Sequence, residues 1–235
     1  MSKVPLMTRI RNKMRDIRHN WSVRIRGTKQ YEKEWSAKEC DKFYWDSREH
    51  PHRALLMIAI SRFSPDSVLE IGCNSGPNLY KLAKIFPNAK LHGIDVSQKA
   101  IDEGRTQLEK CSIINVSLEL GKADDLSKFE DRSIDVVVSD AVMIYIGKDK
   151  IEKVVKEMLR VARKAIILVE WHDTAATTSG SFLFKRGYWT RDYVSLFKGR
   201  DRVEDIQLTK ITRDIWNDEC WSKYGHVIEV ALRNE

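Results

Sequence analysis

Cysteine is scarce in this sequence, and the few cysteines present form no recognisable disulfide or metal-binding pattern. Only four occur in 235 residues, with no Cys-x-x-Cys pair and no histidine at metal-ligand spacing: Cys40, Cys73, Cys111 and Cys220. We therefore expect buried free thiols in a reducing cytoplasm, and no metal site. No stretch approaches the ~18 consecutive apolar residues that a spanning helix needs, which argues against a transmembrane protein.

Charge is plentiful but unevenly distributed. Hydrophobic residues make up 42% and charged residues 32% of the chain, a composition typical of a soluble globular protein with one domain and an appendage. The net charge of +7 arises from residues 1–30, where nine Lys and Arg residues stand against one Asp. The rest of the chain is close to neutral, which disfavours a body that follows nucleic-acid phosphates.

Residues 1–30 form a basic arm with apolar residues at helical spacing. These apolar positions recur at intervals of three and four: Met7, Ile10, Met14, Ile17 and Trp21. Three interpretations stay open: docking on its own domain or on a second subunit, contact with an anionic membrane surface, and contact with nucleic acid. We favour docking. No continuous apolar segment follows the basic residues, so the arm does not resemble a secretory signal, and we expect a cytoplasmic protein.

From about residue 66, apolar runs alternate with helical patterns. The apolar runs predict strands at Ser67–Ile71, Lys90–Ile94, Ile114–Leu118, Ile134–Ser139 and Ala165–Val169. The helical patterns occupy Pro77–Phe86, Gln98–Cys111, Leu126–Glu130, Lys150–Ala162 and Thr190–Phe197. Two further strands, Val203–Ile215 and His226–Leu232, are expected to pair as an antiparallel edge hairpin with no helix between them. The pattern predicts an α/β fold with a doubly wound, mostly parallel, seven-stranded sheet.

The junction after the first predicted strand combines an acid, two glycines and a helix start. Glu70 precedes Gly72 and Gly76, and Asn74 between them tolerates a left-handed backbone. A dinucleotide fingerprint would need glycines at positions 72, 74 and 77, so the match to nicotinamide or flavin enzymes fails. Asp95 ends the second predicted strand, where a carboxylate can accept hydrogen bonds from both hydroxyls of a ribose.

This combination resembles the class I S-adenosylmethionine-dependent methyltransferase family. The family's first motif, acid-x-Gly-x-Gly-x-Gly, is matched by residues 70–76, with Asn74 in place of the middle glycine. Its later motifs resemble residues 93–97, 121–126 and 134–141. The resemblance implies a Rossmann-like fold with S-adenosylmethionine as cofactor. The cofactor-binding residues that it implies are Glu70, Gly72, Cys73, Asn74, Gly76, Asp95, Val96, Ala123, Asp124 and Ser139. For Asp124, capping of a helix is the alternative.

Two further groups of residues are candidates for catalysis and acceptor binding. His172, just past the fifth predicted strand, is a candidate general base because its unperturbed pKa is ~6.5, and Tyr145 is a second catalytic candidate. A surface histidine that merely ends a strand is the alternative. Residues 31–64 are expected to form a helical lid over a catalytic domain at 65–235. The candidate acceptor-binding residues in this lid are Tyr44, Trp45, His50 and Arg53, for which plain core or surface positions are the alternative.

The sequence thus predicts a methyltransferase that acts on a small-molecule or metabolite acceptor. An RNA or protein methyltransferase that grips its substrate with the basic arm is one alternative, and a non-catalytic, cofactor-binding partner subunit is another. The fourth predicted strand is followed by Asp140-Ala141-Val142 rather than by the Asn/Asp-Pro-Pro-aromatic run of amino-directed nucleic-acid methyltransferases, so nucleic acid is the less favoured partner. The arm leaves a homo-oligomer contact and a membrane-surface contact open.

Overall fold

The computed structural model describes residue 14 and residues 27–37, 43–183 and 187–233. The predicted apolar stripe of the basic arm therefore lies outside the described residues, apart from Met14. Within the described residues, no helix combines the length and the apolar character required to cross a membrane.

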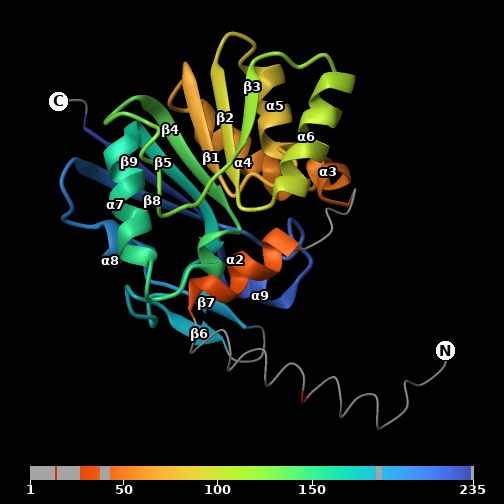
Figure 1. Cartoon of the computed structure of the whole chain (residues 1–235). Helices are drawn as coiled ribbons and strands as arrows, with labels where there is room; N and C mark the ends of the chain where they lie inside the picture. Colours follow the sequence, from red (N-terminus) through yellow and green to blue (C-terminus); the bar gives the residue numbers. More distant parts are fainter. Residues whose placement is uncertain (1–13, 15–26, 38–42, 184–186, 234–235) are drawn as a thin grey trace.

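The centre of the fold is a seven-stranded sheet in the order β3-β2-β1-β4-β5-β9-β8 (Figure 1). The strands are β1 Ser67–Ile71, β2 Lys90–Asp95, β3 Val116–Leu120, β4 Ile134–Asp140, β5 Ala162–Trp171, β8 Val203–Lys210 and β9 Gly225–Leu232. The first five pair in parallel, whereas β9 runs antiparallel to both β5 and β8. The predicted doubly wound sheet with an antiparallel edge hairpin is confirmed.

Helices cover both faces of this sheet. One face carries α4 His52–Ser61, α5 Pro77–Ile85 and α6 Gln98–Lys110, and the other carries α7 Ile151–Val161 and α8 Tyr193–Phe197. Because side chains alternate across a strand, Val68 packs against the first helix layer and its neighbour Leu69 against the second. Strands buried in this way are apolar on both faces, which explains the continuous apolar runs in the sequence.

Local signals fix where the helices of the first layer begin. Ser97 caps α6, as its hydroxyl accepts a hydrogen bond from the Ala100 N–H at 3.3 Å. Pro77 occupies the first turn of α5, where its missing N–H costs nothing. Gly76, immediately before it, has a φ of 77°, a left-handed conformation that glycine adopts without strain. These starts place the glycine turn against the carboxyl end of β1.

The predicted helix at Leu126–Glu130 is wrong. Side chains of the second layer satisfy the backbone of this segment instead of an internal helical ladder. Arg160 donates to the carbonyls of Leu126 and Phe129, and Glu157 accepts from the Leu126 N–H. The segment is therefore a loop held onto α7.

The prediction of no helix between the last two strands is also wrong. Strand β8 ends at Lys210, and helix α9 Glu219–Tyr224 precedes β9. Asp218 caps α9 by accepting hydrogen bonds from the N–H groups of Cys220 and Trp221.

Smaller differences concern Thr190 and the third strand. Thr190 belongs to a hairpin of β6 Ser181–Leu183 and β7 Tyr188–Thr190, and α8 begins only after the cap Asp192. Strand β3 starts two residues later than predicted, because Asn115 donates to the carbonyls of Phe86 and Ala89 in a turn.

The segment before the sheet is helical where it is described. It contains α2 Thr28–Ala37, α3 Phe43–Asp46 and the 3-10 turn η1 Ser47–Glu49, followed by α4. Thr28 connects α2 to the loop that precedes α7, since its hydroxyl donates to Asp149 at 3.1 Å and accepts from the Gly147 N–H at 2.8 Å.

The cysteines of the described residues are free thiols, but the expectation that all are buried is wrong, because Cys111 is exposed and Cys220 half-buried.

Candidate active site

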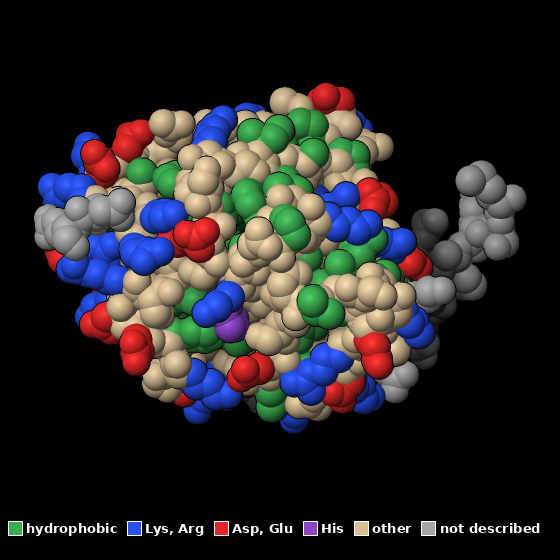
Figure 2. All heavy atoms as spheres, turned by 90° about the horizontal axis from the view of Figure 1, so that it is seen from above, with side chains coloured by type: hydrophobic (Ala, Val, Ile, Leu, Met, Phe, Trp, Pro, Cys, Tyr) green, Lys and Arg blue, Asp and Glu red, His purple; other side chains and the backbone are tan. Residues whose placement is uncertain are grey.

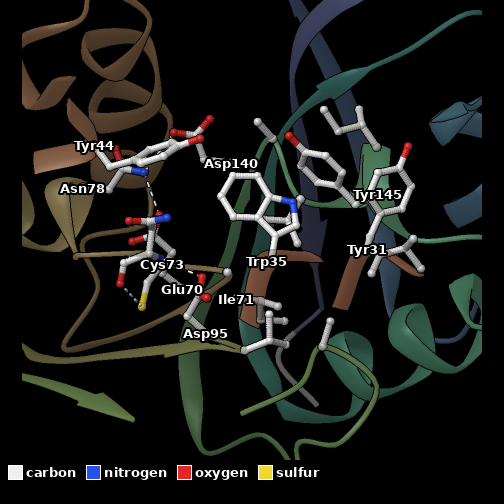
Figure 3. Close-up of a pocket in the computed structure, with 18 of the residues that line it drawn as sticks. Tyr31, Trp35, Tyr44, Glu70, Ile71, Cys73, Asn78, Asp95, Asp140 and Tyr145 are labelled. Atoms are coloured by element: carbon white, nitrogen blue, oxygen red, sulfur yellow. Dashed lines mark hydrogen bonds between the residues drawn. The ribbon is translucent and has the colours of Figure 1, made fainter. Parts of the chain in front are cut away.

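The carboxyl ends of β1, β2 and β4 open onto a cavity of about 440 Å³. Further lining residues come from helices α2 to α5, from the ends of β3 and β5, from β7, and from the connection between β8 and β9. Open α/β sheets bind their ligands at this edge, and the volume suits a small molecule. Figure 3 shows the carboxylates of Glu70, Asp95 and Asp140 toward one side and the rings of Tyr145 and Tyr31 toward the other, with Trp35 between them.

The glycine turn forms the floor of the cavity, and its backbone conformation requires the residues found there. Gly72 has a φ of 71°, and a Cβ at this position would lie 2.3 Å from Cγ2 of Val142. Asn74 has a φ of 49°, which asparagine tolerates better than most residues. The Gly72 and Cys73 N–H groups both donate to the Ile94 carbonyl, so the turn is fixed to the end of β2.

Asp95 braces the same turn from the end of β2. Its two carboxylate oxygens accept hydrogen bonds from the Asn74 N–H and the Ser97 N–H, each at 2.9 Å. Burial raises the pKa of Asp95, an effect that the backbone N–H groups oppose. The carboxylate lines the cavity, in a position to accept further hydrogen bonds from a ligand.

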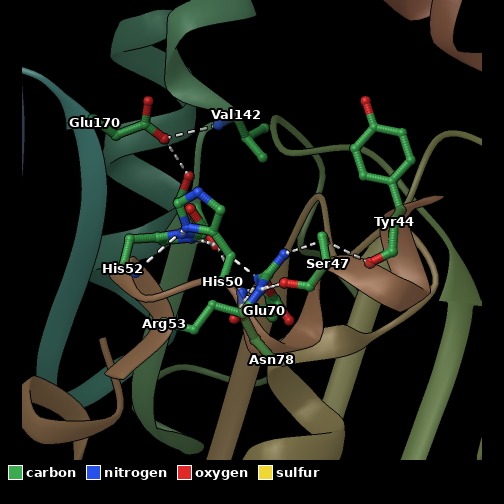
Figure 4. A network of polar contacts seen from close by, with 11 residues as sticks. Tyr44, Ser47, His50, His52, Arg53, Glu70, Asn78, Val142 and Glu170 are labelled. Carbon is green, nitrogen blue, oxygen red and sulfur yellow. Dashed lines mark hydrogen bonds and ion pairs between the residues drawn. The ribbon is translucent and has the colours of Figure 1, made fainter. Parts of the chain in front are cut away.

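A buried polar network joins the ends of β1 and β4 (Figure 4). Asn78 of α5 donates to Glu70 at 2.7 Å and to Asp140 at 3.0 Å, while its own carbonyl oxygen accepts from Arg53 at 2.6 Å. Arg53 also donates to Asp140 at 3.1 Å and to the Ser47 hydroxyl and carbonyl. Helix α4 and turn η1 are therefore attached to the acids of the cavity.

Glu70 and Asp140 respond oppositely to burial. Burial raises the pKa of Glu70 to about 8. For Asp140, burial is outweighed by His52, Arg53 and Asn78, which hold its pKa well below the usual value. The second oxygens, Oε2 of Glu70 and Oδ1 of Asp140, have no hydrogen-bond partner among the described residues. Two unpartnered carboxylate oxygens in one cavity suit a positively charged ligand group.

Asp140 is also the first member of a series of contacts that runs through the imidazole of His52 to that of His50, which lines the cavity. Its Oδ2 lies 3.0 Å from Nε2 of His52, and Nδ1 of His52 lies 2.6 Å from Nδ1 of His50. Trp216 stacks on His52, with ring centroids 4.2 Å apart, and contacts His50 at 4.8 Å. Trp216 in turn stacks on Trp221 at 3.9 Å, so both imidazoles have fixed orientations.

The other side of the cavity is built from aromatic rings. Tyr145 is central to this aromatic wall: its ring lies 4.9 Å from Tyr31, 5.4 Å from Trp35 and 5.2 Å from Tyr188, in edge-to-face arrangements. Tyr44 extends the wall through Trp35, at 5.8 Å. Such a surface favours a flat or apolar ligand.

Glu170 fixes the conformation of residues 142–144, which follow β4. This buried carboxylate accepts hydrogen bonds from the Ser139 hydroxyl and from three consecutive N–H groups, those of Val142, Met143 and Ile144. Burial raises its pKa to about 7, although these donors oppose the rise. The acid thus holds the loop that leads from β4 to Tyr145.

Most of the candidate residues from the sequence line this cavity, although their binding roles remain predictions. They are Glu70, Gly72, Cys73, Asn74, Asp95, Val96, Ala123, Asp124, Tyr44, His50, Arg53 and Tyr145. Asp124 caps no helix in the described residues. It forms an ion pair at 3.1 Å with Lys150, which also contacts Glu32 of α2 at 2.5 Å.

Four candidates do not line it. His172 is buried behind the strand end, where its Nδ1 accepts from the Tyr193 N–H at 3.1 Å; Trp171 faces the cavity instead, since neighbouring strand residues point to opposite faces. We therefore correct the assignment of His172 as the base that meets the acceptor. Trp45 is a core residue that packs on Tyr80 at 5.2 Å.

The remaining two candidates support the cavity from behind. The Ser139 hydroxyl is buried and used by Glu170 rather than turned toward a ligand. Gly76 shapes the turn through its positive φ without lining the space. Resemblance to a family motif is what suggested both positions, and a motif can include residues that shape the turn as well as residues that contact a ligand.

Several lining residues were missed in the sequence. Asn78 and His52 stand on helices whose faces could not be assigned, and Tyr31, Trp35 and Trp216 come from segments without a motif. The stretch His50-Pro51-His52 is the sequence signal for a pair of neighbouring imidazoles, because a proline at a helix start brings the side chains on either side of it close together.

Comparisons with known proteins agree with this geometry. Residues 68–165 match the family model described as a methyltransferase domain. A trans-aconitate 2-methyltransferase of Afipia carboxidovorans is 34% identical over 85 residues, which cover 36% of this chain and 32% of that protein. The matched parts span 59%, 27% and 32% of the lengths of the first three curated relatives.

Solved structures share the fold at low sequence identity. The [4+2]-cyclase SpnF superposes with a TM-score of 0.61 at 14% identity, covering 77% of this chain and 81% of that one. A geranyl diphosphate methyltransferase in complex with GPP and sinefungin gives a TM-score of 0.61 at 14% identity, covering 77% of this chain and 78% of that one. The family-model match over residues 68–165, the strand order and the acid-glycine turn together support a class I S-adenosylmethionine-dependent methyltransferase family for this chain.

Proposed function

We propose that this chain transfers a methyl group from S-adenosylmethionine to a small acceptor with a flat or apolar body. The observation that carries the proposal is the division of one cavity. Unpartnered carboxylate oxygens of Glu70 and Asp140 lie at its strand end, and an aromatic wall centred on Tyr145 lies opposite. The first side suits a cationic cofactor and the second a hydrophobic acceptor.

The residues of the cavity fit S-adenosylmethionine in three places. The two unpartnered oxygens would accept hydrogen bonds from the ammonium of its amino-acid part. Asp95, at the end of β2, would accept from the ribose hydroxyls. Ala123 and Asp124, which follow β3, would flank the adenine, with the ion pair between Lys150 and Asp124 closing that end.

When bound, S-adenosylmethionine supplies an electrophilic methyl group, which bonds to the acceptor atom as the bond to sulfur breaks and its electron pair stays on sulfur. The chain's own residues position the two reactants. Positioning of this kind can lower a barrier by ~7 kcal/mol or more. Tyr31, Trp35 and Tyr145 would hold the acceptor against the glycine turn and exclude water from the space between.

A small acceptor is favoured over a macromolecule. The trans-aconitate and geranyl diphosphate methyltransferases that resemble this chain are named for small substrates. Basic and acidic side chains are interspersed over the face shown in Figure 2, a pattern unlike a surface that follows phosphates. The cyclase of the same fold favours one alternative, a reaction in which the cavity binds a small molecule without transferring a methyl group.

One labelling experiment separates these functions. The full chain would be incubated with methyl-labelled S-adenosylmethionine and, in parallel, with a metabolite extract, an RNA pool and a protein pool. Label in a small molecule of the extract supports the proposal. Label confined to RNA or protein contradicts it, as does a chain that binds the cofactor but labels none of the pools.

The same experiment tests the role of the basic arm when it is repeated with a truncated chain. A chain that lacks residues 1–26 keeps all of the described residues that line the cavity, so it is expected to retain cofactor binding and methylation of a small acceptor. Loss of labelling together with loss of salt-dependent RNA binding would instead favour an RNA methyltransferase. Sedimentation of both chains, alone and with anionic vesicles, tests the proposed homo-oligomer and membrane contacts of the arm.

A further inference from the structure

The chain of contacts from Asp140 through His52 to His50 has the form of a proton relay. It consists of a carboxylate oxygen 3.0 Å from Nε2 of His52 and two Nδ1 atoms 2.6 Å apart. His50 lines the cavity, and its Nε2 has no hydrogen-bond partner among the described residues. The relay therefore begins at a buried acid and ends at an imidazole that lines the cavity.

The charges around the relay determine which nitrogens carry protons. Asp140 is ionised and can only accept, because His52, Arg53 and Asn78 hold its pKa low against the effect of burial. In the neutral form of His52, Nε2 carries the hydrogen that faces this carboxylate, which makes Nδ1 an acceptor. It follows that His50 donates through Nδ1 and keeps a lone pair on Nε2. The His52 backbone N–H also donates to Nδ1 of His50 at 3.4 Å, and this longer contact is given up when Nδ1 carries the hydrogen of the relay.

We propose that Nε2 of His50 is the general base that removes the proton of the acceptor, with His52 and Asp140 as positioning residues, and that the acceptor group is an acidic hydroxyl such as a phenol or enol. This inference rests on the proposed methyltransferase function and specifies its acceptor.

The proton movements balance. As the new O–C bond forms, the hydroxyl proton moves to Nε2 of His50, and the proton on Nδ1 of His50 moves to Nδ1 of His52. The resulting imidazolium of His52 is held by the carboxylate of Asp140, 3.0 Å away. A positive charge is thereby placed next to an acid that is already ionised, rather than left in the aromatic part of the cavity.

The pKa of His50 determines which kinds of acceptor group it can deprotonate. Burial is the main cause that lowers the pKa of His50, while Asp140 opposes the change. Such an imidazole is too weak to ionise an aliphatic alcohol, but it can take the proton of a phenol, whose pKa is about 10, as methyl transfer proceeds. A neutral amine needs no base before it attacks. The aromatic wall also favours stacking of a phenol ring.

Nitrogen-15 NMR of the histidine rings tests the relay without knowledge of the acceptor. In the full chain at neutral pH, with and without S-adenosylhomocysteine, we expect His52 with its hydrogen on Nε2 and His50 with its hydrogen on Nδ1. In His52→Gln the amide can still reach Asp140 but offers nothing to His50, so the His50 tautomer should change. Hydrogen on Nε2 of His50 in the unmodified chain would overturn the relay, whatever its activity.

Turnover with a panel of phenols and matched anilines tests the acceptor class. His50→Asn, which removes Nε2, should lower kcat for phenols by ~10²-fold or more. His52→Gln should lower it less and shift the pH profile, whereas the control His92→Gln, on β2 outside the cavity, should not change it. Equal rates in His50→Asn, or methylation of anilines but not phenols, would contradict the proposal. Calorimetry with S-adenosylhomocysteine shows separately whether the cofactor site is intact.

Discussion

Arg53 of α4 determines how the amide of Asn78 on α5 is oriented. The guanidinium donates to the amide oxygen at 2.6 Å, so the amide nitrogen faces Glu70 at 2.7 Å and Asp140 at 3.0 Å. Helix α4 is thus bonded to Asp140 directly and to Glu70 through Asn78, and these are the two acids that we propose to hold the cofactor.

Asn78→Leu should therefore destabilise the protein and weaken cofactor binding together. The substitution keeps the branched heavy-atom skeleton of the side chain but leaves Arg53, Glu70 and Asp140 each with one hydrogen bond fewer, at a cost of about 1–3 kcal/mol for each buried group left unsatisfied. Urea unfolding and calorimetry with S-adenosylhomocysteine measure the two effects. Asn88→Leu, at an exposed position, is the matched control. Unchanged affinity in Asn78→Leu would show that the network does not organise the cofactor site.

Gly72→Ala should abolish cofactor binding for a steric reason. A Cβ at Gly72 would overlap Val142 in a backbone of positive φ, so the turn or the loop that leads to Tyr145 must move. Gly199→Ala is an informative control, because Gly199 has a φ of 76° but no atom within 4 Å of the added Cβ. It should cost only the backbone strain of about 1–2 kcal/mol. Equal loss of stability and no loss of binding in the two variants would exclude steric contact as the cause.

The pH dependence of stability should report the buried acid Glu70. Burial raises its pKa from 4.5 to about 8, so the folded state holds a proton that the unfolded state has released between these values. Its contribution to stability is complete below pH 4.5 and is lost as the pH rises through about 8. Urea unfolding of the ligand-free chain should show this decline, and Glu70→Gln should reduce it. Glu109→Gln, at an exposed position on α6, should leave the profile unchanged.

Cofactor binding should release this proton. The cofactor's ammonium next to Glu70 would favour the charged carboxylate and lower its pKa from about 8. At pH 7, the calorimetric heat of S-adenosylhomocysteine binding should then vary with the ionisation enthalpy of the buffer, and Glu70→Gln should remove most of that variation. Heats independent of the buffer would place the ammonium away from Glu70.

The sheet and the cofactor side of the cavity could be predicted from the sequence because their signals are local. Apolar runs, Pro77 and Ser97 mark strands and helix starts, and Glu70 and Asp95 stand at strand ends that topology brings together. The error at His172 was one of side-chain direction, since a one-residue change along a strand reverses the face.

The acceptor side could not be predicted in the same way. Its rings come from α2, from the loop after β4, from β7 and from the α9 region, which meet only through tertiary packing. Sequence periodicity cannot show that Tyr31 and Tyr188, 157 positions apart, both contact Tyr145. The loop at 126–130 is a similar case, because the groups that satisfy its backbone belong to α7.

Titration calorimetry of the full chain with S-adenosylhomocysteine tests the central claim most directly. We expect saturable one-to-one binding that Asp95→Ala weakens by about 10- to 150-fold, the loss of ~1.5–3 kcal/mol typical of hydrogen bonds to a charged group. NADH should give no binding heat, because the turn around Asn74 lacks the dinucleotide glycines. Binding of NADH with no binding of S-adenosylhomocysteine would contradict the assignment of this cavity.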